Sequence, residues 1–599
     1  MNKRVEILQE FVYYLFDSLL IPLIRATFYV TESQVYRNRL FYFRHDVWRR
    51  LTEGPLAELK SSVFVELPKK RAEEILAQKR LPWASVRLLP KATGVRPITN
   101  LSRKTQLKGA GNSTFLSLSI NSMMAPVYSV LNYEKSRRPD LFGSSLFSVD
   151  EIYHRLKAFK MKFRDQQSPF YFVKLDIEHC FDTIPQRRLL DLARRLVSES
   201  AYTISKHAQI RPSNGPNSLS HYEQADPQGK HWRKFVTRAA PEGSVSSLPD
   251  RTDIRSNAVY VDLATIYKRS TDELLARLNE LVRGNLVKMG KKFFKQRQGI
   301  PQGSILSTLL CNYFYGALER EVLGFLSSGD ALLLRFVDDF LLITPNAGLA
   351  RQFLQVMMDG QPDYGVSVNP SKSLVNFEVT VNGIVLPRLQ DSVWFPYCGN
   401  LIDTRTLEFK RNFAAMVQGN PIDGVTVEYS RSPGQQLYRK LVSSFQVVQN
   451  STMLWDTQHN RPRTVLGGIY AGFVHMANKM YWYVRSLRRR SQASPKLLLK
   501  TVHELIRSTI SRIRSEHKKQ KNQLGEQQEQ FECRVAPHQI SYLGVVAFRR
   551  TLGRRQTLFP VVLRALKQME RQYRPKTDRE RLYLRQIIQD EDEFSGWTL

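Results

Sequence analysis

The chain has 599 residues, of which 42% are hydrophobic and 11% aromatic. A single core stops growing beyond about 250–300 residues, so three or four packed units are expected and wholesale disorder is excluded. Lysine and arginine together number 89 against 55 acidic residues, which gives a formal net charge of +34. A surface this positive attracts polyanions, and nucleic acid is the expected partner.

Cysteine usage argues against a disulfide framework or a structural zinc site, and it fits a reducing compartment. The cysteines are widely spaced and form no C-x-x-C pair: Cys180, Cys311, Cys398 and Cys533.

The N-terminus begins like a signal peptide, with Lys3 and Arg4 before an apolar run, but acidic residues such as Asp17 interrupt that run. Since no stretch reaches about 18 uncharged apolar residues, no membrane span and no membrane partner are expected.

Hydrophobic periodicity predicts helices and strands in a definite order along the chain. Apolar residues at helical spacing predict a helix over residues 5–27, and an extended aromatic run follows at 28–30. Residues 82–185 alternate between strand-like and helical stretches, and the alternation returns over 257–400. Residues 203–256 are rich in Ser, Asn, Pro, Gly and Gln, which predicts an irregular surface insertion.

The last part of the chain, from about residue 406, is predicted to be mainly helical and is markedly basic. Its basic clusters are Arg488-Arg489-Arg490, Lys518-Lys519 and Arg549-Arg550. Such clusters suit contacts with phosphates, although most individual charges could equally lie on solvated helix faces.

Two adjacent carboxylates interrupt an apolar stretch at residues 332–343, where Asp338 and Asp339 lie between two hydrophobic runs. This pattern predicts a β-hairpin, buried on both faces, with the two aspartates at its turn. Carboxylates held together in this way repel each other unless a cation lies between them, and a hard divalent metal would relieve the repulsion.

A third carboxylate, Asp176, ends the apolar strand at residues 171–176. Together with Asp338 it could hold two Mg²⁺ ions about 3.5–4 Å apart, the arrangement used in phosphoryl transfer. The alternative is that the hairpin pair is only a turn and that Asp176 only ends a strand.

Between these features lies the loop 298–304, which precedes a helical run over 305–323. Ser304 is a candidate N-cap, and Gly299 and Gly303 would let the backbone approach a bound nucleotide closely. A simple loop before a helix is the alternative.

The Asp176 strand, the glycine loop and the aspartate hairpin follow one another in the order of the palm motifs of reverse transcriptases. Further segments are similar to motifs of the telomerase reverse transcriptase family: 28–32 (end of the T motif), 87–91 and 96–100 (motifs 1 and 2), 130–134, 298–307 (B′), 337–339 (C), 364–369 with Lys372 (D), and 394–399 with 403–408 (E). The chain is identified as resembling this family from about residue 28 to 408.

The resemblance implies an α/β right-hand polymerase with palm, fingers carrying an insertion, and a largely α-helical C-terminal thumb. Residues 1–75 would be the C-terminal remnant of an RNA-binding domain, and 76–408 the reverse transcriptase domain with its insertion at about 186–290. Residues 409–599 would be the thumb. Since the family carries further domains upstream, the chain would be N-terminally truncated.

The resemblance also implies roles at the reaction centre. Asp176, Asp338 and Asp339, with the backbone of Ile177, would bind two catalytic Mg²⁺ ions. Lys372 would lie near the leaving pyrophosphate and protonate it, or it is a lone surface lysine.

Nucleotide contacts are implied for the fingers and palm. Lys91 and Arg96 would neutralise the incoming triphosphate, unless they are solvated charges. Phe181 holds the position of an aromatic gate against ribonucleotides, where vertebrate telomerases have tyrosine, although a core phenylalanine is the alternative. Gln302, Gly303 and Val337 would line the nucleotide pocket.

The primer end would be held by Tyr397, Cys398 and Gly399. Cys398 is not expected to be a nucleophile, because no histidine accompanies it.

The implied function is RNA-templated extension of chromosome 3′ ends with telomeric repeats, in the nucleus at telomeres. The implied partners are telomerase RNA, telomeric single-stranded DNA, the RNA–DNA hybrid, dNTPs and holoenzyme proteins. A mobile-element reverse transcriptase and a non-catalytic nucleic-acid scaffold are the alternatives; intact carboxylates and basic residues argue against the scaffold.

Overall fold

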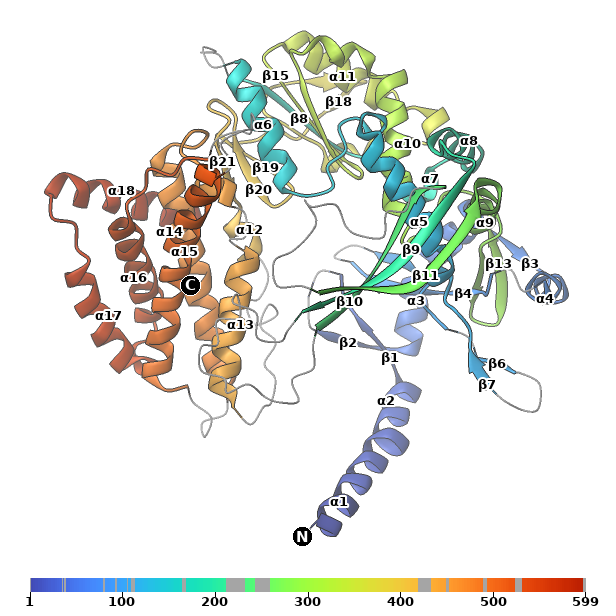
Figure 1. The fold of residues 1–599 in the computed structure, drawn as a ribbon, viewed down its shortest axis with the longest axis horizontal. Coiled ribbons are helices and arrows are strands. Elements are labelled where there is room, and N and C mark those ends of the chain that lie inside the picture. The colour runs from blue at the N-terminus through green and yellow to red at the C-terminus, as the bar shows by residue number, and fades with distance from the viewer. Residues whose placement is uncertain are drawn as a thin grey trace.

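The structure is a computed structural model of the chain. It describes residues 2–34, 36, 39–78, 81–91, 94–104, 106–108, 114–163, 169–211, 232–242, 259–390, 392–417, 432–448, 452–487, 493–522 and 531–595. Part of the predicted irregular insertion and the cluster Arg488-Arg489-Arg490 lie outside the described residues. Helices and sheets are arranged as three groups, with the C-terminal helices on one side and the N-terminal sheets on the other (Figure 1).

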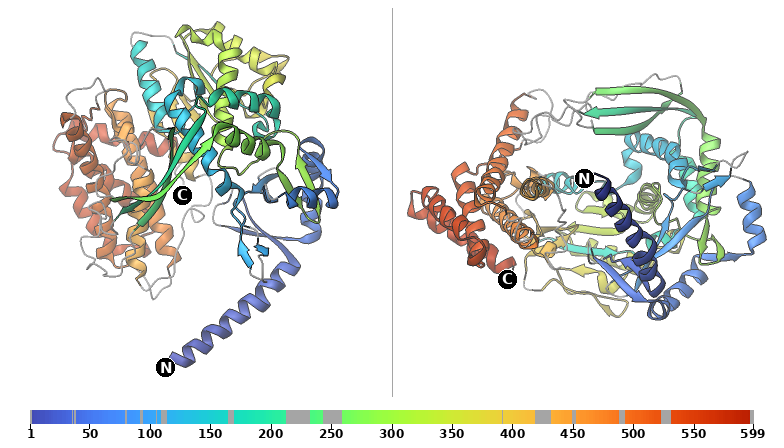
Figure 2. Two further views of the ribbon diagram at one scale, coloured as in Figure 1. Left: turned by 45° about the vertical axis from the view of Figure 1, so that its right-hand side comes forward. Right: turned by 90° about the horizontal axis from the view of Figure 1, so that it is seen from below.

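A long helix projects from the body at the N-terminus (Figures 1 and 2). It runs through α1 (Asn2–Tyr14), a π-helical stretch η1 (Leu15–Leu20) and α2 (Ile21–Thr27), which confirms the predicted helix. The antiparallel pair β1 (Phe28–Glu32) and β2 (Leu40–Arg44) follows, then α3 (His45–Ser62). The ring of Tyr29 stacks on Trp48 with centroids 4.3 Å apart.

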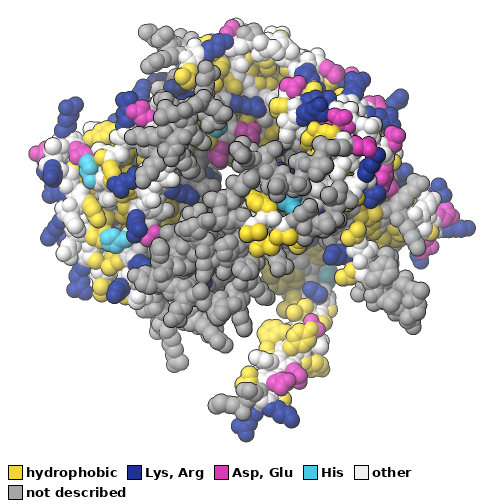
Figure 3. Space-filling model, viewed as in Figure 1, with side chains coloured by type: hydrophobic (Ala, Val, Ile, Leu, Met, Phe, Trp, Pro, Cys, Tyr) yellow, Lys and Arg dark blue, Asp and Glu magenta, His cyan; other side chains and the backbone are white. Residues whose placement is uncertain are grey.

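The projecting helix exposes many hydrophobic side chains, with acidic side chains between them and basic ones near its free end (Figure 3). Over Lys3–Thr27 it is long and apolar enough to cross a membrane, with mean hydropathy 1.5, and none of this stretch is buried. This average tolerates isolated charges, which the criterion of an uncharged apolar stretch did not, so the expected absence of a membrane span stays a prediction.

The fingers contain a five-stranded sheet in the order β3-β13-β12-β4-β5. Its strands and flanking elements are β3 (Phe64–Leu67), α4 (Lys69–Ala77), β4 (Ala84–Pro90), β5 (Val95–Asn100), β12 (Leu286–Met289) and β13 (Lys292–Gln296), with the small hairpin β6 (Gln106–Lys108) and β7 (Thr114–Leu116) beyond them. The sheet thus joins segments that precede the strand ending at Asp176 in the sequence with segments that follow it.

The insertion is more regular than its composition predicted. Between α8 (Gln186–Leu196) and α9 (Thr271–Arg283), three strands form an antiparallel sheet in the order β10-β9-β11. They are β9 (Ala201–Arg211), β10 (Trp232–Pro241) and β11 (Val259–Ser270). The prediction of irregular structure over 203–256 was wrong for β9 and β10, since alternate residues of β9 such as Tyr202 and Ile204 are buried, whereas β11 lies where strand and helix alternation was predicted.

The palm is built on a sheet in the order β14-β15-β8-β16, with all neighbouring strands antiparallel. Its elements are α5 (Ile120–Arg137), η3 (Pro139–Phe142), α6 (Asp150–Lys162), β8 (Tyr171–Asp176), α7 (Cys180–Thr183), α10 (Ser307–Glu321), η5 (Gly324–Ser328), β14 (Leu332–Phe336), β15 (Asp339–Thr344), α11 (Ala347–Met358), η6 (Pro362–Tyr364), η7 (Pro370–Lys372) and β16 (Leu374–Val375).

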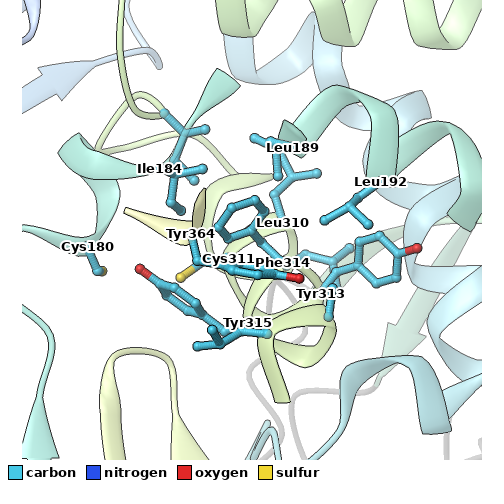
Figure 4. Packing of buried hydrophobic residues seen from close by; sticks show 14 of the residues in the cluster. Cys180, Ile184, Leu189, Leu192, Leu310, Cys311, Tyr313, Phe314, Tyr315 and Tyr364 are labelled. Carbon is cyan, nitrogen blue, oxygen red and sulfur yellow. The ribbon is translucent and has the colours of Figure 1, made fainter. Parts of the chain in front are cut away.

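Both faces of the palm sheet are buried, as predicted for the hairpin. One face carries Val173, Leu175, Phe340 and Leu342 in the main core, and the other carries Phe172, Leu341 and Ile343 in a second core. On the first face, side chains of α8 and α10 such as Leu189 and Phe314 pack together (Figure 4). Burial on both faces fixes the register of these strands, because a one-residue slip would exchange the two sets.

A small three-stranded sheet joins the palm to the C-terminal helices. It consists of β19 (Trp394–Tyr397), β20 (Asn400–Asp403) and β21 (Phe409–Arg411), and the short pair β17 (Thr380–Val381) and β18 (Ile384–Val385) precedes it.

The C-terminal part is helical, as predicted, and has a core of its own. Its elements are α12 (Phe413–Val417), α13 (Pro433–Val448), η9 (Thr452–Trp455), α14 (Pro462–Ser486), α15 (Pro495–Asn522), α16 (Pro537–Gly553), η11 (Gln556–Leu558), α17 (Pro560–Gln572) and α18 (Asp578–Ser595). The central α14 packs against α16 and α13.

Candidate active site

Three carboxylates that are distant in sequence lie together at one end of the palm sheet. The register of β15 against β8 pairs Asp339 directly with Asp176. The backbone N–H of Ile177 donates to the carbonyl oxygen of Asp338 at 3.3 Å. Side chains directly opposite each other in a sheet have Cβ atoms about 4.5–5.5 Å apart, so the carboxylates of Asp176 and Asp339 are neighbours.

The turn of the hairpin differs from the prediction by one residue. Phe336 pairs with Asp339, so the two-residue turn is Val337-Asp338 and Asp339 already belongs to β15. Val337 adopts the left-handed φ of +62°. A β-branched residue is strained there, at a cost of about 1–3 kcal/mol, and such strain gathers at functional sites.

Burial disfavours the charged forms of both hairpin aspartates. Burial raises the pKa of Asp338, and the negative charge of Asp176 raises it further. The pKa of Asp339 rises to about 6, chiefly through burial, although Lys174 opposes the rise from 3.9 Å away. Each carboxylate would therefore gain from a cation placed between them.

Asp176 already has a cationic partner in Lys372 on η7. The Nζ of Lys372 lies 2.8 Å from the carboxylate of Asp176, and this contact raises the pKa of the lysine. Lys372 therefore keeps its proton at neutral pH, next to the carboxylates.

The donor chemistry suits a hard divalent cation, because the side chains supply only carboxylate oxygens. The thiol of Cys180 also makes a weak contact with Asp338, with Sγ 3.7 Å from Oδ2. Within the described residues, no three His, Cys, Asp or Glu side chains converge closely enough to hold an ion by themselves. The carboxylates fit Mg²⁺ in kind, while Lys372 occupies one of them.

The fingers hairpin brings two cations toward these carboxylates. Lys91 and Arg96 lie on either side of the β4–β5 turn, which the N–H of Lys91 closes by donating to the oxygen of Gly94 at 2.9 Å. Burial lowers the pKa of Lys91, and the positive charges of Arg96 and Lys372 lower it further. The three basic groups therefore share one region of positive potential.

Gln302 links the fingers to the palm. Its Oε1 accepts from Nε of Arg96 at 3.4 Å, and its Nε2 donates to Asp182 at 2.9 Å. Burial raises the pKa of Asp182. Sequence reasoning missed Asp182, although its position directly after Phe181 was a usable signal.

The glycines of the loop before α10 lie against the backbone of other segments. A Cβ at Gly299 would overlap the carbonyl oxygen of Phe181, and one at Gly303 would overlap that of Thr99. Both glycines also have positive φ angles, of +70° and +122°. These glycines therefore allow backbone to pack closely on backbone, and their approach to a bound nucleotide stays a prediction.

The predicted cap of α10 is also wrong. The helix begins at Ser307 and not at residue 305, after Leu306, and no side chain caps it. Ser304 instead accepts a hydrogen bond from the N–H of Leu306 at 3.2 Å within the preceding turn.

Phe181 is half-buried on α7 and packs against the main core. Its carbonyl oxygen accepts from the N–H of Ile300 at 2.7 Å. The ring thus has a packing role, and its role as a gate stays a prediction.

The β19–β20 turn is hydrogen-bonded to β15, the strand that begins at Asp339. The hydroxyl of Tyr397 donates to the carbonyl oxygen of Asp339 at 3.0 Å. Cys398 and Gly399 both have positive φ angles, and burial raises the pKa of the Cys398 thiol to about 12. A thiol with this pKa stays protonated at neutral pH, in agreement with the prediction that Cys398 is no nucleophile.

Comparisons with known proteins agree with this geometry. Residues 1–59 match the family described as "Telomerase ribonucleoprotein complex - RNA binding domain", and residues 259–389 match "Reverse transcriptase (RNA-dependent DNA polymerase)". The chain is 32% identical to the telomerase reverse transcriptase of Mus musculus over 80% of its length and 43% of the relative's. For that of Canis lupus familiaris the figures are 32%, 81% and 43%.

Solved structures show the same fold. The telomerase from Candida albicans, solved with a fragment of telomeric RNA, covers 98% of this chain and 77% of its own, with a TM-score of 0.58 and 16% identity. The predicted right-hand polymerase fold is thereby confirmed. The chain spans less than half the length of the curated relatives. Over the four fifths that match these relatives, the chain belongs to the telomerase reverse transcriptase family.

Proposed function

We propose that this chain is the catalytic subunit of a telomerase, an RNA-directed DNA polymerase that extends chromosome 3′ ends with telomeric repeats. One observation carries the proposal: the register of β8 and β15 that pairs Asp176 with Asp339 and sets Asp338 beside them. Names of the relatives support the activity, and the RNA in the Candida albicans structure supports a separate telomerase RNA as the template.

In the proposed reaction, the primer 3′-hydroxyl loses its proton to water as its oxygen bonds to the α-phosphorus of a dNTP, and the bond to the leaving pyrophosphate breaks in line. Asp176, Asp338 and Asp339, with the backbone of Ile177, would hold two Mg²⁺ ions. When bound, these ions supply positive charge at the attacking and leaving oxygens.

The chain's basic groups would act on the nucleotide. Lys91 and Arg96 would bind the triphosphate oxygens, Arg96 as a two-pronged donor and Lys91 as a point charge. Lys372, whose pKa is raised by Asp176, would give its proton to the leaving pyrophosphate oxygen. Departure of Asp176 toward a bound cation would free the ammonium for this step.

Other residues would select and hold the substrates. The Phe181 ring would exclude a ribose 2′-hydroxyl, and Gln302, Gly303 and Val337 would line the nucleotide pocket. The turn at Tyr397, Cys398 and Gly399 would hold the primer end, supported by the contact of Tyr397 with the strand of Asp339.

The proposal extends to the partition of the chain and to its surroundings. Residues 1–75 would be part of the RNA-binding domain, 76–408 the reverse transcriptase domain with its insertion at about 186–290, and 409–599 the thumb on the hybrid. Telomeric single-stranded DNA, dNTPs and holoenzyme proteins would be partners in the nucleus, at telomeres.

The test is extension of a telomeric DNA primer by the full chain with its co-purified RNA. We expect extension to require added Mg²⁺ and to disappear after ribonuclease treatment. Asp338→Ala should lower the rate by at least about a hundredfold while primer–template affinity stays near that of the wild type.

Asp363→Ala, at an exposed aspartate of η6, is the matched control and should keep the wild-type rate. Extension by Asp338→Ala at the wild-type rate would refute the metal assignment, and extension that resists ribonuclease would refute a resident RNA template.

A further inference from the structure

A charged side chain lies entirely inside the palm, directly behind the candidate catalytic turn. Arg335 is on β14, two residues before Val337, and is 0% exposed. Its Nε donates to Oε1 of Glu319 at 2.6 Å, and its Nη1 donates to Oδ1 of Asn312 at 3.2 Å. Glu319 and Asn312 lie two turns apart on α10, so the guanidinium fastens strand β14 to one face of this helix.

The other arm of the guanidinium reaches the segment after α5. Nη2 of Arg335 donates to the carbonyl oxygen of Phe142 at 3.1 Å, to Oγ of Ser145 at 2.6 Å and to the carbonyl oxygen of Asn312 at 3.0 Å. All three nitrogens of the guanidinium are therefore satisfied, as a buried cation requires.

Glu319 is held as firmly as its partner. Its carboxylate accepts from the N–H of Ser144 at 2.6 Å and from the Ser144 hydroxyl at 2.8 Å. Gly143 has a φ of +56°, and a Cβ at this position would overlap the Glu319 carboxylate. The chain leaves room for the carboxylate only because residue 143 has no side chain.

The network also includes the main chain of β14 just before the Val337-Asp338 turn. The N–H of Arg335 donates to Ser144 at 3.1 Å, and its carbonyl oxygen accepts from Leu146 at 2.8 Å. Nη1 of Arg335 lies 3.5 Å from the carbonyl oxygen of Val337, whose φ is strained. Strained residues persist only where their surroundings over-determine the conformation, and this network lies where such constraint is needed.

Stability alone does not account for the network, because a buried ion pair is often no more stabilising than apolar side chains of similar volume. We infer that Arg335 and Glu319 are positioning residues, which fix the strained Val337-Asp338 turn and thereby the distance of Asp338 from Asp176. The inference rests on the proposed function, since it assigns the network to the same reaction centre.

Two variants test this inference, and neither leaves a charge buried without a partner. Arg335→Lys keeps the charge and can pair with Glu319, but it loses the planar fork that reaches Phe142 and Ser145. Arg335→Met combined with Glu319→Leu removes both charges together, so that neither is left buried alone. Each is compared with the wild type by melting temperature, primer–template affinity, kcat, KM for dNTP and the Mg²⁺ concentration that gives half-maximal rate.

We expect kcat to fall at least about tenfold in both variants, and half-maximal Mg²⁺ to rise, because misplacing a reacting group by about 1 Å can cost a hundredfold. KM for dNTP and primer–template affinity should stay within about twofold of the wild type. A purely structural role would lower the melting temperature but leave kcat and the Mg²⁺ dependence of the folded protein unchanged.

A matched control lies on the same helix. Glu321 of α10 pairs with Arg188 on the palm surface, and Arg188→Met with Glu321→Leu should leave kcat and the Mg²⁺ dependence at wild-type values. A folded Arg335→Lys protein with wild-type kcat and Mg²⁺ dependence would overturn the inference and leave the proposed function standing. A wild-type chain that extends no primer would instead overturn both.

Discussion

The palm and the thumb both have buried hydrophobic cores, but strained backbone conformations occur in the palm and not in the described thumb helices. All the non-glycine residues with positive φ in the described chain lie between β8 and β21: His179, Val337, Asn382, Cys398 and Leu407. The thumb helices, over their described residues, have none. Because such conformations cost free energy, a fold that needed only stability would avoid them. The comparison indicates that the palm gives up stability to place particular groups, whereas the thumb is built from regular helices.

The same substitution should change the free energy of unfolding much more in the thumb than in the palm. In the thumb, Val546 is buried within α16, so Val546→Gly removes core packing and places glycine in a helix. We expect a loss of about 3–4 kcal/mol in the free energy of unfolding. In the palm, Val337→Gly relieves a strained φ, so the change should be about 1 kcal/mol or less in either direction.

Denaturant unfolding of both variants tests this contrast. A loss at Val337 as large as that at Val546 would contradict the claim that the turn is strained. In the activity assay, Val337→Gly should lose rate, since a freer turn places Asp338 less well.

Lys372 provides a smaller effect, on activity alone. Lys372→Met removes the proposed proton donor, and we expect kcat to fall by about a hundredfold or less with little change in KM for dNTP. Single-nucleotide incorporation measured across pH is the readout, and the alkaline limb of the profile should move in the variant. If Lys372→Met only raised KM, the lysine would be a binding group and not an acid.

A further effect is expected on how the free energy of unfolding changes with pH. The pKa of Asp339 is about 6 in the folded chain, against an ordinary value of about 3.9 when unfolded. The folded state therefore binds the proton more tightly, so this group's contribution is fully present below about pH 4 and is lost as pH rises through 6. The loss is about 3 kcal/mol, since one pKa unit corresponds to about 1.36 kcal/mol.

Asp339→Asn should remove this pH dependence and stabilise the metal-free protein at pH 7 by about 1–2 kcal/mol. Denaturant unfolding at pH 4, 5, 6 and 7 measures it, with Asp363→Asn as the exposed control. A variant that loses stability at pH 7 would show that the charge of Asp339 is favourably paired.

Local patterns in the sequence sufficed for the hairpin, the strand that ends at Asp176, the N-terminal helix and the helical thumb. Each depends on hydrophobic periodicity over a short stretch. Order of motifs then led to the family and the fold. The meeting of Asp176 with the hairpin was predicted, but its direct pairing with Asp339 was not, since register between distant strands leaves no mark on either strand alone.

Features that depend on distant contacts escaped prediction. Arg335 stands in an apolar run, and nothing nearby marks Glu319 as its partner. The close packing of Gly299 and Gly303 on the backbones of Phe181 and Thr99 could not be predicted, because these neighbours are far away in sequence. β9 and β10 of the insertion were not predicted, because the stretch is polar on average and the alternate buried residues of β9 do not stand out in it.

We propose that Asp176, Asp338 and Asp339 jointly hold divalent cations. Electron paramagnetic resonance of Mn²⁺, titrated into the full chain with primer–template and a non-hydrolysable dNTP analogue, counts the bound ions directly. We expect two tightly bound ions per wild-type chain and a loss of tight binding in Asp338→Ala. Equal Mn²⁺ binding by the wild type and by Asp338→Ala would contradict it.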